Sequence, residues 1–376
     1  MASGSRAADP KNRPYRIEDV TRWDTIVIGG GVIGLSLAWE LRKRGTAVLV
    51  LERGELGGEA SCAAGGMLAW CDPHLPEPAR GLALLSARCY AEFVEEIEQV
   101  SRTTVDLRQF GTIVVDEEAP AAFASECRTL SVGDLTAIEP GLRSGSRSAQ
   151  WWPEWSVDPR RLIASLTGAC HARGVALRTS VAVTEVVVER QRSVGVRSTQ
   201  GEFLAEAVVN CAGAWASEIH SCLEPSPSPT MPVKGQMLAL EARGLRHVVR
   251  SPDVYLIPRS DGTVVVGATV EETGFDKETH PAAIERLRTA AVELFPQLAD
   301  ARVRETWAGL RPASADGLPI LGETSLPGFF VASGHFRDGI LLAPGTARVM
   351  AKLVSGEPVS SEFLPLSPKR FAVAVP

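Results

Sequence analysis

The chain has 376 residues, of which 45% are hydrophobic and 22% are charged, and its formal net charge is −6 at pH 7. A chain of this length can bury a large core and is expected to form two domains. The acidic balance argues against a nucleic-acid partner, because phosphate binding requires a basic surface. No apolar run reaches the roughly 18 residues that a membrane span requires.

The N-terminal segment and the cysteines indicate the cellular compartment in which the protein is expected to function. Residues 1–22 carry charged residues and prolines without the apolar stretch of a secretory signal, so we expect a flexible extension. The seven cysteines form no Cys-x-x-Cys pair and lie beside no histidine cluster. This pattern is typical of a reduced, cytoplasmic protein and predicts neither a disulfide framework nor a metal site.

The first predicted elements form a βαβ unit in the segment "DTIVIGGGVIGLSLAWELRKRGTAVLVLER", residues 24–53. Residues 25–28 are a β-branched run that suits a buried parallel strand, and residues 35–44 repeat apolar side chains at helical spacing. Residues 47–51 predict a second strand. The unit therefore has the order expected for a dinucleotide-binding domain.

Three glycines fall at the first turn of this unit. Gly29, Gly31 and Gly34 would allow a tight turn, the approach of the backbone to a pyrophosphate, and close packing of the helix on the strand. Glu52 ends the second strand, where a carboxylate can accept hydrogen bonds from ribose hydroxyls and disfavours a 2′-phosphate. This stretch predicts a dinucleotide but does not distinguish NAD from FAD.

Later segments add loops that suit a flat ligand. "EASCAAGGMLA", residues 59–69, is rich in small residues, which let the backbone lie close to a ring. Residues 175–206 alternate like short antiparallel strands with a turn at Gln200-Gly201. The segment from residue 207, "AVVNCAGAWASEI", predicts a strand, a turn at 212–214 and the start of a helix.

The last third of the chain continues this pattern. The Pro/Ser-rich segment 223–232 can continue neither a helix nor a central strand, so we interpret it as a crossing between domains. From residue 327 the sequence predicts a strand, a glycine-rich loop and a helix over about 339–354. The N-terminus of that helix could face a developing negative charge.

These segments, in this order, resemble the FAD-dependent amine oxidases of the D-amino-acid oxidase superfamily, and within it the glycine oxidases of the thiamine pathway. The motifs that carry the resemblance extend from residue 24 to about 356. They are "VIGGGVIGLS", "SCAAGGMLA", "PVKGQ" (232–236), "VYLIPRSDGTVVVGAT" (254–269), "WAGLRPASADGLPILG" (307–322) and "GHFRDGILLAPGTA" (334–347).

The resemblance implies an α/β fold with a Rossmann-like FAD-binding domain and a second, α+β substrate domain built on an antiparallel sheet. The FAD-binding domain is expected to be discontinuous. Its predicted segments are 23–85, 156–224 and 316–376, and those of the substrate domain are 86–155 and 225–315.

The resemblance also implies which residues bind FAD. They are Gly29, Gly31, Val32, Ile33, Gly34, Glu52, Arg53, Ala60, Ser61, Gly65, Gly66, Met67, Val181, Ala212, Gly213, His335, Phe336, Arg337, Asp338, Gly339, Ile340 and Leu341. Cys62 and Cys211 do not occupy the position of the flavin-linking cysteine in the sarcosine oxidase branch, so we expect FAD to be bound without a covalent bond.

Three residues are the catalytic candidates. Arg311, in "WAGLRP", is by resemblance the clamp for the substrate carboxylate, a group for which a planar guanidinium is a bidentate partner. Tyr255 is expected to hydrogen-bond that carboxylate or to shape the pocket. The resemblance also implies that the Arg337 side chain contacts the substrate, and the alternative is an ion pair with a nearby acid such as Asp338. No dedicated base stands out, and His335 is expected to be a packed or hydrogen-bonded group.

Two departures from the glycine oxidase pattern bear on the substrate. Asp253 and Val270 stand where the family tends to carry His and Met. A carboxylate would attract a cation and a valine would free volume, so amines larger than glycine fit this pattern.

The implied activity is the oxidation of glycine, sarcosine or small D-amino acids, with hydride transfer from Cα to the flavin and reduction of O₂ to H₂O₂. A flavin dehydrogenase with another electron acceptor, and a protein without turnover or with a nicotinamide, remain alternatives. The expected partners are a small amino acid and O₂, and the sequence leaves a homo-oligomer open.

Overall fold

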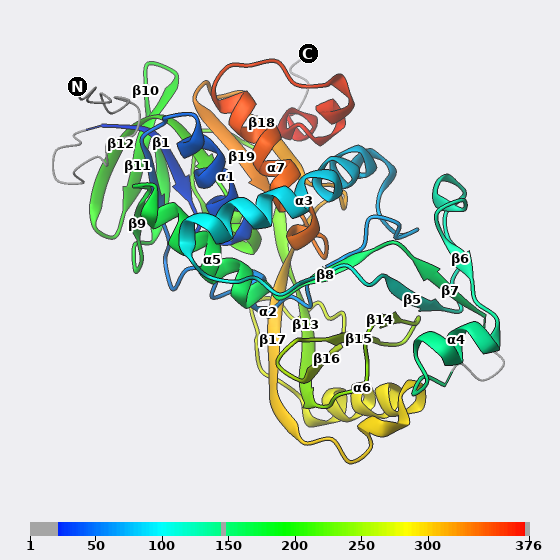
Figure 1. Ribbon diagram of the computed structural model, residues 1–376. Coiled ribbons are helices and arrows are strands. Elements are labelled where there is room, and N and C mark those ends of the chain that lie inside the picture. Colours follow the sequence, from blue (N-terminus) through cyan, green and yellow to red (C-terminus); the bar gives the residue numbers. More distant parts are fainter. Residues whose placement is uncertain (1–21, 144–147, 373–376) are drawn as a thin grey trace, which may run out of the picture.

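Two sheets of eight strands each organise the computed structural model, which describes residues 22–143 and 148–372 (Figure 1). Apart from Arg22, the predicted extension 1–22 lies outside the described residues. Within the described part of the chain, no helix is both long and apolar enough to cross a lipid bilayer.

The first sheet has a parallel centre. Its strands are β1 (Trp23–Ile28), β2 (Val48–Leu51), β9 (Ala176–Arg178), β10 (Val183–Glu189), β11 (Arg192–Ser198), β12 (Gly201–Asn210), β18 (Ile320–Glu323) and β19 (Phe329–Ser333). β1 lies between β2 and β12 and pairs with both in parallel, whereas β10, β11 and β18 join in antiparallel fashion. The predicted βαβ unit is confirmed, and the Gln200-Gly201 turn lies between β11 and β12.

Four helices pack against one another beside this sheet (Figure 1). They are α1 (Val32–Lys43), α3 (Arg80–Ser101), α5 (Pro159–Ala172) and α7 (Gly339–Val354). Their apolar faces form one core with β1 and β2, which includes Leu35, Phe93, Leu166 and Leu342. The predicted helix over 339–354 matches the bounds of α7.

The second sheet is antiparallel except where β5 meets β14. Its strands, in spatial order, are β17 (Val303–Ser314), β13 (Thr230–Glu241), β16 (Thr263–Gly267), β15 (Tyr255–Pro258), β14 (Val248–Arg250), β5 (Thr112–Val115), β7 (Ala149–Trp152) and β6 (Arg128–Thr129). Helix α6 (Pro281–Leu294) packs on it, and Leu238, Val266 and Leu287 share its core. This antiparallel sheet beside a Rossmann-like one confirms the predicted fold class.

The remaining elements are short. A three-stranded sheet contains β3 (Met67–Leu68), β8 (Trp155–Val157) and β4 (Leu107–Arg108). The short helices are α2 (Ala60–Ala63), α4 (Val132–Ile138), η3 (Glu77–Ala79), η4 (Ala121–Phe123), η5 (Gly213–Glu218), η6 (Pro296–Leu298), η7 (Ser361–Leu366) and η8 (Pro368–Phe371). The helix expected after residue 214 is therefore a 3₁₀ helix of six residues, η5.

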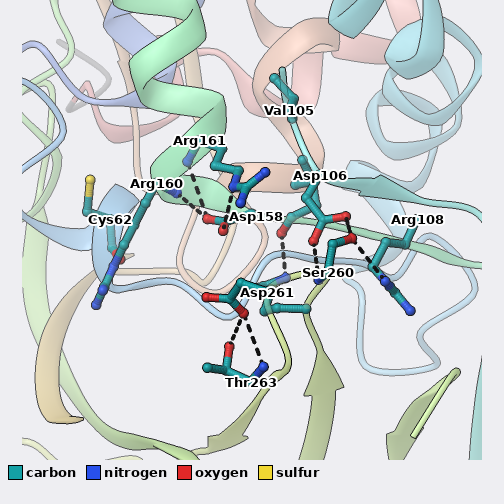
Figure 2. Close-up of polar contacts among 12 residues, drawn as sticks. Cys62, Val105, Asp106, Arg108, Asp158, Arg160, Arg161, Ser260, Asp261 and Thr263 are labelled. Atoms are coloured by element: carbon teal, nitrogen blue, oxygen red, sulfur yellow. Dashed lines mark hydrogen bonds and ion pairs between the residues drawn. The ribbon is translucent and has the colours of Figure 1, made fainter. Parts of the chain in front are cut away.

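Polar contacts join the second sheet to the segment before β4 (Figure 2). The Asp106 carboxylate accepts hydrogen bonds from the Ser260 amide at 2.8 Å and from the Ser260 hydroxyl at 2.5 Å. Nearby, Asp158 caps α5 by accepting from the Arg160 amide at 2.9 Å. The two bonds from Ser260 thus hold the β15–β16 turn against the segment that leads into β4.

The predicted domain segments can be compared with these elements. Residues 223–229 lead from the first sheet into β13 of the second, as the predicted crossing 223–232 requires. The last three residues of that segment, 230–232, are predicted to lie outside any central strand but belong to β13, where they pair with β17. The predicted boundary between residues 85 and 86 falls inside α3, which packs on α5 and α7. The division into FAD-binding and substrate segments stays a prediction.

Candidate active site

A cavity of about 650 Å³ is lined by residues of both sheets, a size typical of small-molecule sites. All the predicted site residues line it except Gly34 and Leu341. Leu341 is 1% exposed and belongs to the core of the first sheet and its helices. Gly34 lies inside α1, where an added Cβ would overlap the Gly29 carbonyl oxygen.

The first turn of the βαβ unit forms one end of the cavity. Gly29 has φ +102°, and an added Cβ would lie 2.5 Å from the Cys211 carbonyl oxygen, so this turn requires glycine. Gly31 precedes α1 and lines the cavity. The Val32 amide at the start of α1 donates to the Ser61 hydroxyl at 2.9 Å, which ties α2 to this helix N-terminus.

Glu52 extends from the end of β2 into the same end of the cavity. Its carboxylate accepts hydrogen bonds from the Gly30 amide at 2.7 Å and from the Gly54 amide at 2.8 Å. These two bonds orient the carboxylate, and each oxygen keeps a lone pair for a further donor such as a hydroxyl.

The small-residue loop packs directly on the second sheet. A Cβ added at Gly65 would lie 2.8 Å from the Ile257 side chain and 3.3 Å from that of Tyr255, so the loop and the sheet are in close contact here. Arg259, which is buried, donates to the carbonyl oxygens of Gly65 at 2.5 Å and Val157 at 2.9 Å. Arg259 therefore positions the loop, a role that no local sequence signal indicates.

Arg311 and Tyr255 meet in the cavity from β17 and β15. Nη1 of Arg311 donates to the carbonyl oxygens of Thr269 at 3.0 Å and Lys234 at 3.3 Å, which fixes one edge of the guanidinium. Gly235 leaves the space that the guanidinium occupies, because an added Cβ would overlap it. Burial raises the pKa of Tyr255, and the adjacent Arg311 partly offsets this increase.

The loop between β19 and α7 forms another wall. His335 is 2% exposed, and its Nε2 lies 3.0 Å from the Thr346 hydroxyl. Burial lowers the pKa of His335 to about 3, so the ring is neutral at physiological pH. Nδ1 of this ring is buried without a hydrogen-bond partner among the described residues, although the residue lines the cavity.

The next two residues of this loop carry charges. The Arg337 guanidinium lies 4.9 Å from the centre of the Phe336 ring. Burial raises the pKa of Asp338 to about 7, and the negative charge of Asp72 adds to this shift while Arg337 opposes it. Both residues line the cavity, so this wall contains one permanent cation and one group that titrates near neutrality.

Sequence reasoning missed a charged end of the cavity. Asp72, Glu117 and Arg250 line it, and they come from the loop after β3, the loop after β5 and the end of β14. Because these segments lie far apart in the chain and match no motif, only the fold brings them together. The two predicted substrate-pocket residues, Asp253 and Val270, are exposed at the cavity, Val270 to 64%.

The thiols near the cavity are poor nucleophiles. Burial raises the pKa of Cys211, which lines the cavity, and of Cys62, which does not. Within residues 22–143 and 148–372, no group of His, Cys, Asp and Glu side chains could hold a metal ion.

The residues present fit FAD. Two helices, α1 and α7, begin at the cavity, and a helix N-terminus with its free N–H groups favours phosphate. Gly29, Gly31 and Gly65 line the cavity, where their backbone can approach a ligand closely because no side chain stands between them. Glu52 would hold a ribose, and the unpaired Nδ1 of His335 could meet a polar group of the ligand.

Comparison with known proteins identifies the family. The family "DAO: FAD dependent oxidoreductase" matches residues 24–353. The chain is 35% identical to the bifunctional protein ThiO/ThiG of Synechocystis sp., over 93% of this chain and 54% of that protein. It thus spans about half the length of such bifunctional relatives. It is 36% identical to the glycine oxidase of Pseudomonas putida, over 89% of this chain and 95% of that protein.

A solved structure agrees with these relatives. The crystal structure of glycine oxidase from Geobacillus kaustophilus matches with a TM-score of 0.85 and 30% identity, over 94% of this chain and 100% of that one. This chain belongs to the DAO family of FAD-dependent oxidoreductases, and its cofactor is FAD.

Proposed function

We propose that the protein is an amino-acid oxidase of the glycine oxidase type, which acts on glycine, sarcosine or small D-amino acids. The observation that carries this proposal is the position of Arg311. Its guanidinium lies beside Tyr255 in the cavity that also contains the glycine-rich cradle for FAD. An arginine held there suits the carboxylate of an amino acid.

The proposed overall reaction converts an amino acid, O₂ and water into the corresponding oxo acid, an amine or ammonia, and H₂O₂. Bound FAD supplies the hydride acceptor. The residues of the chain bind and orient the substrate: Arg311 holds the carboxylate, and Tyr255 lies against it. This orientation supplies the effective concentration on which the reaction depends.

The substrate amine must be neutral before Cα can release a hydride. His335 is neutral and hydrogen-bonded to Thr346, so we assign it no role as a proton acceptor. The rate is therefore expected to rise with pH until the substrate amine has lost its proton.

Release of H₂O₂ from a panel of amines tests this function. We expect turnover with glycine and sarcosine first, D-alanine and D-proline next, and L-amino acids last. Turnover only with an artificial electron acceptor, without consumption of O₂, would instead indicate a dehydrogenase. A faster reaction with an L-amino acid than with any of the others would contradict the proposed stereochemistry.

A further inference from the structure

Strand β13 separates the cavity from a layer of polar side chains. Gly235 and Met237 line the cavity, whereas Lys234 and Gln236 alternate with them along the strand and do not line it. Successive side chains of a strand point to opposite faces, so these two lie behind the cavity wall. Both are 0% exposed. Two fully buried polar residues of the motif "PVKGQ" thus stand outside the cavity.

The Lys234 ammonium is paired with a residue of the β16–α6 segment, residues 268–280, which joins strand β16 to helix α6. Its Nζ donates a hydrogen bond to the Asp276 carboxylate and lies 3.5 Å from Nε2 of His280. The bond from Lys234 lowers the pKa of Asp276, so this carboxylate is ionised at neutral pH. A buried ammonium requires such a partner, because an unpaired charge is costly to remove from water.

Gln236 ties the same segment to β13 at two further points. Its Nε2 donates to the Glu271 carboxylate at 2.7 Å, and its Oε1 accepts from the His280 amide at 2.6 Å. The backbones of Lys234 and Glu271 also exchange hydrogen bonds of 2.8 and 3.0 Å. The β16–α6 segment is therefore held near its start, in its middle and at its end by residues of one strand.

This segment supplies a hydrogen-bond acceptor to Arg311. Nη1 of Arg311 donates to the carbonyl oxygen of Thr269, which belongs to the β16–α6 segment, and to that of Lys234 itself. The backbone amide of Gln236 donates to the Thr269 hydroxyl at 2.8 Å, which fixes Thr269 against β13. Displacement of the segment would free one edge of the guanidinium, which would then have to be ordered again when it binds a carboxylate.

We propose that Lys234 and Gln236 are positioning residues for the substrate-carboxylate clamp: by holding the β16–α6 segment on β13, they keep Arg311 in its binding orientation before the substrate arrives. This arrangement lowers the entropic cost of binding, because the guanidinium is already immobilised. The inference rests on the proposed amino-acid oxidase function, and in particular on Arg311 as the partner of the carboxylate.

Lys234→Met tests the inference, because it approximately keeps the length of the side chain and removes its charge. We expect KM for sarcosine to rise about 3- to 10-fold, the effect of having to order one side chain on binding. The value of kcat should change less, since the carboxylate contact is already made in the ground state. Flavin content and melting temperature verify that each variant is folded.

A double-mutant cycle decides whether Lys234 acts through Arg311. Lys234→Met should lower kcat/KM for sarcosine about 3- to 10-fold in the wild type. In Arg311→Ala, measured at high enzyme concentration, it should have little further effect, because the side chain that it positions is absent. Equal factors in the two backgrounds, or a fall in kcat without a rise in KM, would overturn the inference.

Asp276→Asn is the second variant, and it replaces Lys234→Met if that protein does not fold. The Asp276 side chain is 36% exposed, and its substitution weakens the same ion pair, so KM should rise about 2- to 3-fold. Glu272→Gln is the matched control, because Glu272 lies in the same segment, is exposed and does not line the cavity. Its KM should equal that of the wild type.

A KM that stays at the wild-type value in Asp276→Asn and in any folded Lys234→Met would also overturn the inference. Failure of the proposed function has a different signature. In that case the wild type oxidises neither sarcosine nor another small amino acid, or Arg311→Ala leaves kcat/KM unchanged, and the positioning role fails with it.

Discussion

At the scale of a single residue, Arg311 is the side chain that the proposed function assigns to the substrate carboxylate. Because one edge of its guanidinium is hydrogen-bonded to the carbonyl oxygens of Thr269 and Lys234, the remainder can serve a substrate carboxylate. Arg311→Ala would leave that carboxylate partly desolvated and unpaired, at a cost of about 2 to 4 kcal/mol. We expect kcat/KM for sarcosine to fall roughly 30- to 1000-fold.

Arg311→Lys should recover only part of this loss, because an ammonium cannot reproduce the planar fork. A primary amine without a carboxylate provides the control, since Arg311→Ala should change its already poor turnover little. Equal losses for both compounds, or loss of FAD, would show that Arg311 is structural.

At the scale of an element, two glycines near the start of helix α1 have different roles: Gly31 lines the cavity, and Gly34 allows the helix to pack closely. Gly31 precedes the helix with φ −76° and ψ −179°, which any residue can adopt, and an added Cβ would lie 3.2 Å from the Ser61 hydroxyl. Gly31→Val should therefore fold yet lose FAD, because its side chain would fill the space needed by a phosphate. Equilibrium dialysis measures FAD binding, and circular dichroism measures folding of the apoprotein.

Gly34 does not line the cavity, and its added Cβ would overlap the Gly29 carbonyl oxygen. Gly34→Val should therefore destabilise the packing of α1 on β1, seen as a lower melting temperature of the apoprotein. If Gly31→Val retains FAD, or if Gly34→Val melts like the wild type, this division of roles is wrong.

At the scale of the whole molecule, buried acids couple stability to pH. Burial raises the pKa of Glu154 to about 7, although Arg250 opposes this increase. Between about pH 4.5 and 7, the Glu154 carboxyl is therefore protonated in the folded state but ionised in the unfolded state. The free energy of unfolding should fall as pH rises through this window, by about 2 to 3 kcal/mol for this group. Urea unfolding at pH 5.5 and pH 8, with FAD in excess, measures the change.

Glu154→Gln should reduce this decrease, because glutamine does not titrate. Asp338, whose pKa burial also raises to about 7, would still contribute to the remaining decrease. His335, whose pKa burial lowers to about 3, opposes it, because below about pH 6.5 its ring is protonated only in the unfolded state. Glu118→Gln, an exposed substitution, should unfold with the same pH dependence as the wild type. An unfolding free energy that rises between pH 5.5 and 8 in the wild type would contradict the assignment.

The sequence by itself determined the βαβ unit, the bounds of α7 and the family. These features depend on local rules: residues 25–28 are apolar and β-branched, α7 repeats apolar side chains at helical spacing, and Gly29 adopts φ +102° in a tight turn. Tyr255 and Arg311 lie in separate motifs, and only the resemblance of these motifs to those of a known family predicted that the two side chains share a pocket.

Only the tertiary structure decided which side chains join the site from distant segments. Arg259 reaches the carbonyl of Gly65, and Arg250 at the end of β14 meets Asp72 from the loop after β3 and Glu117 from the loop after β5, without any pattern in the chain that links them. The predicted boundary at residue 85 falls within α3 for a related reason, since the partners of a helix are set by long-range packing. Contacts between segments far apart in sequence arise from the fold, and a local pattern cannot specify them.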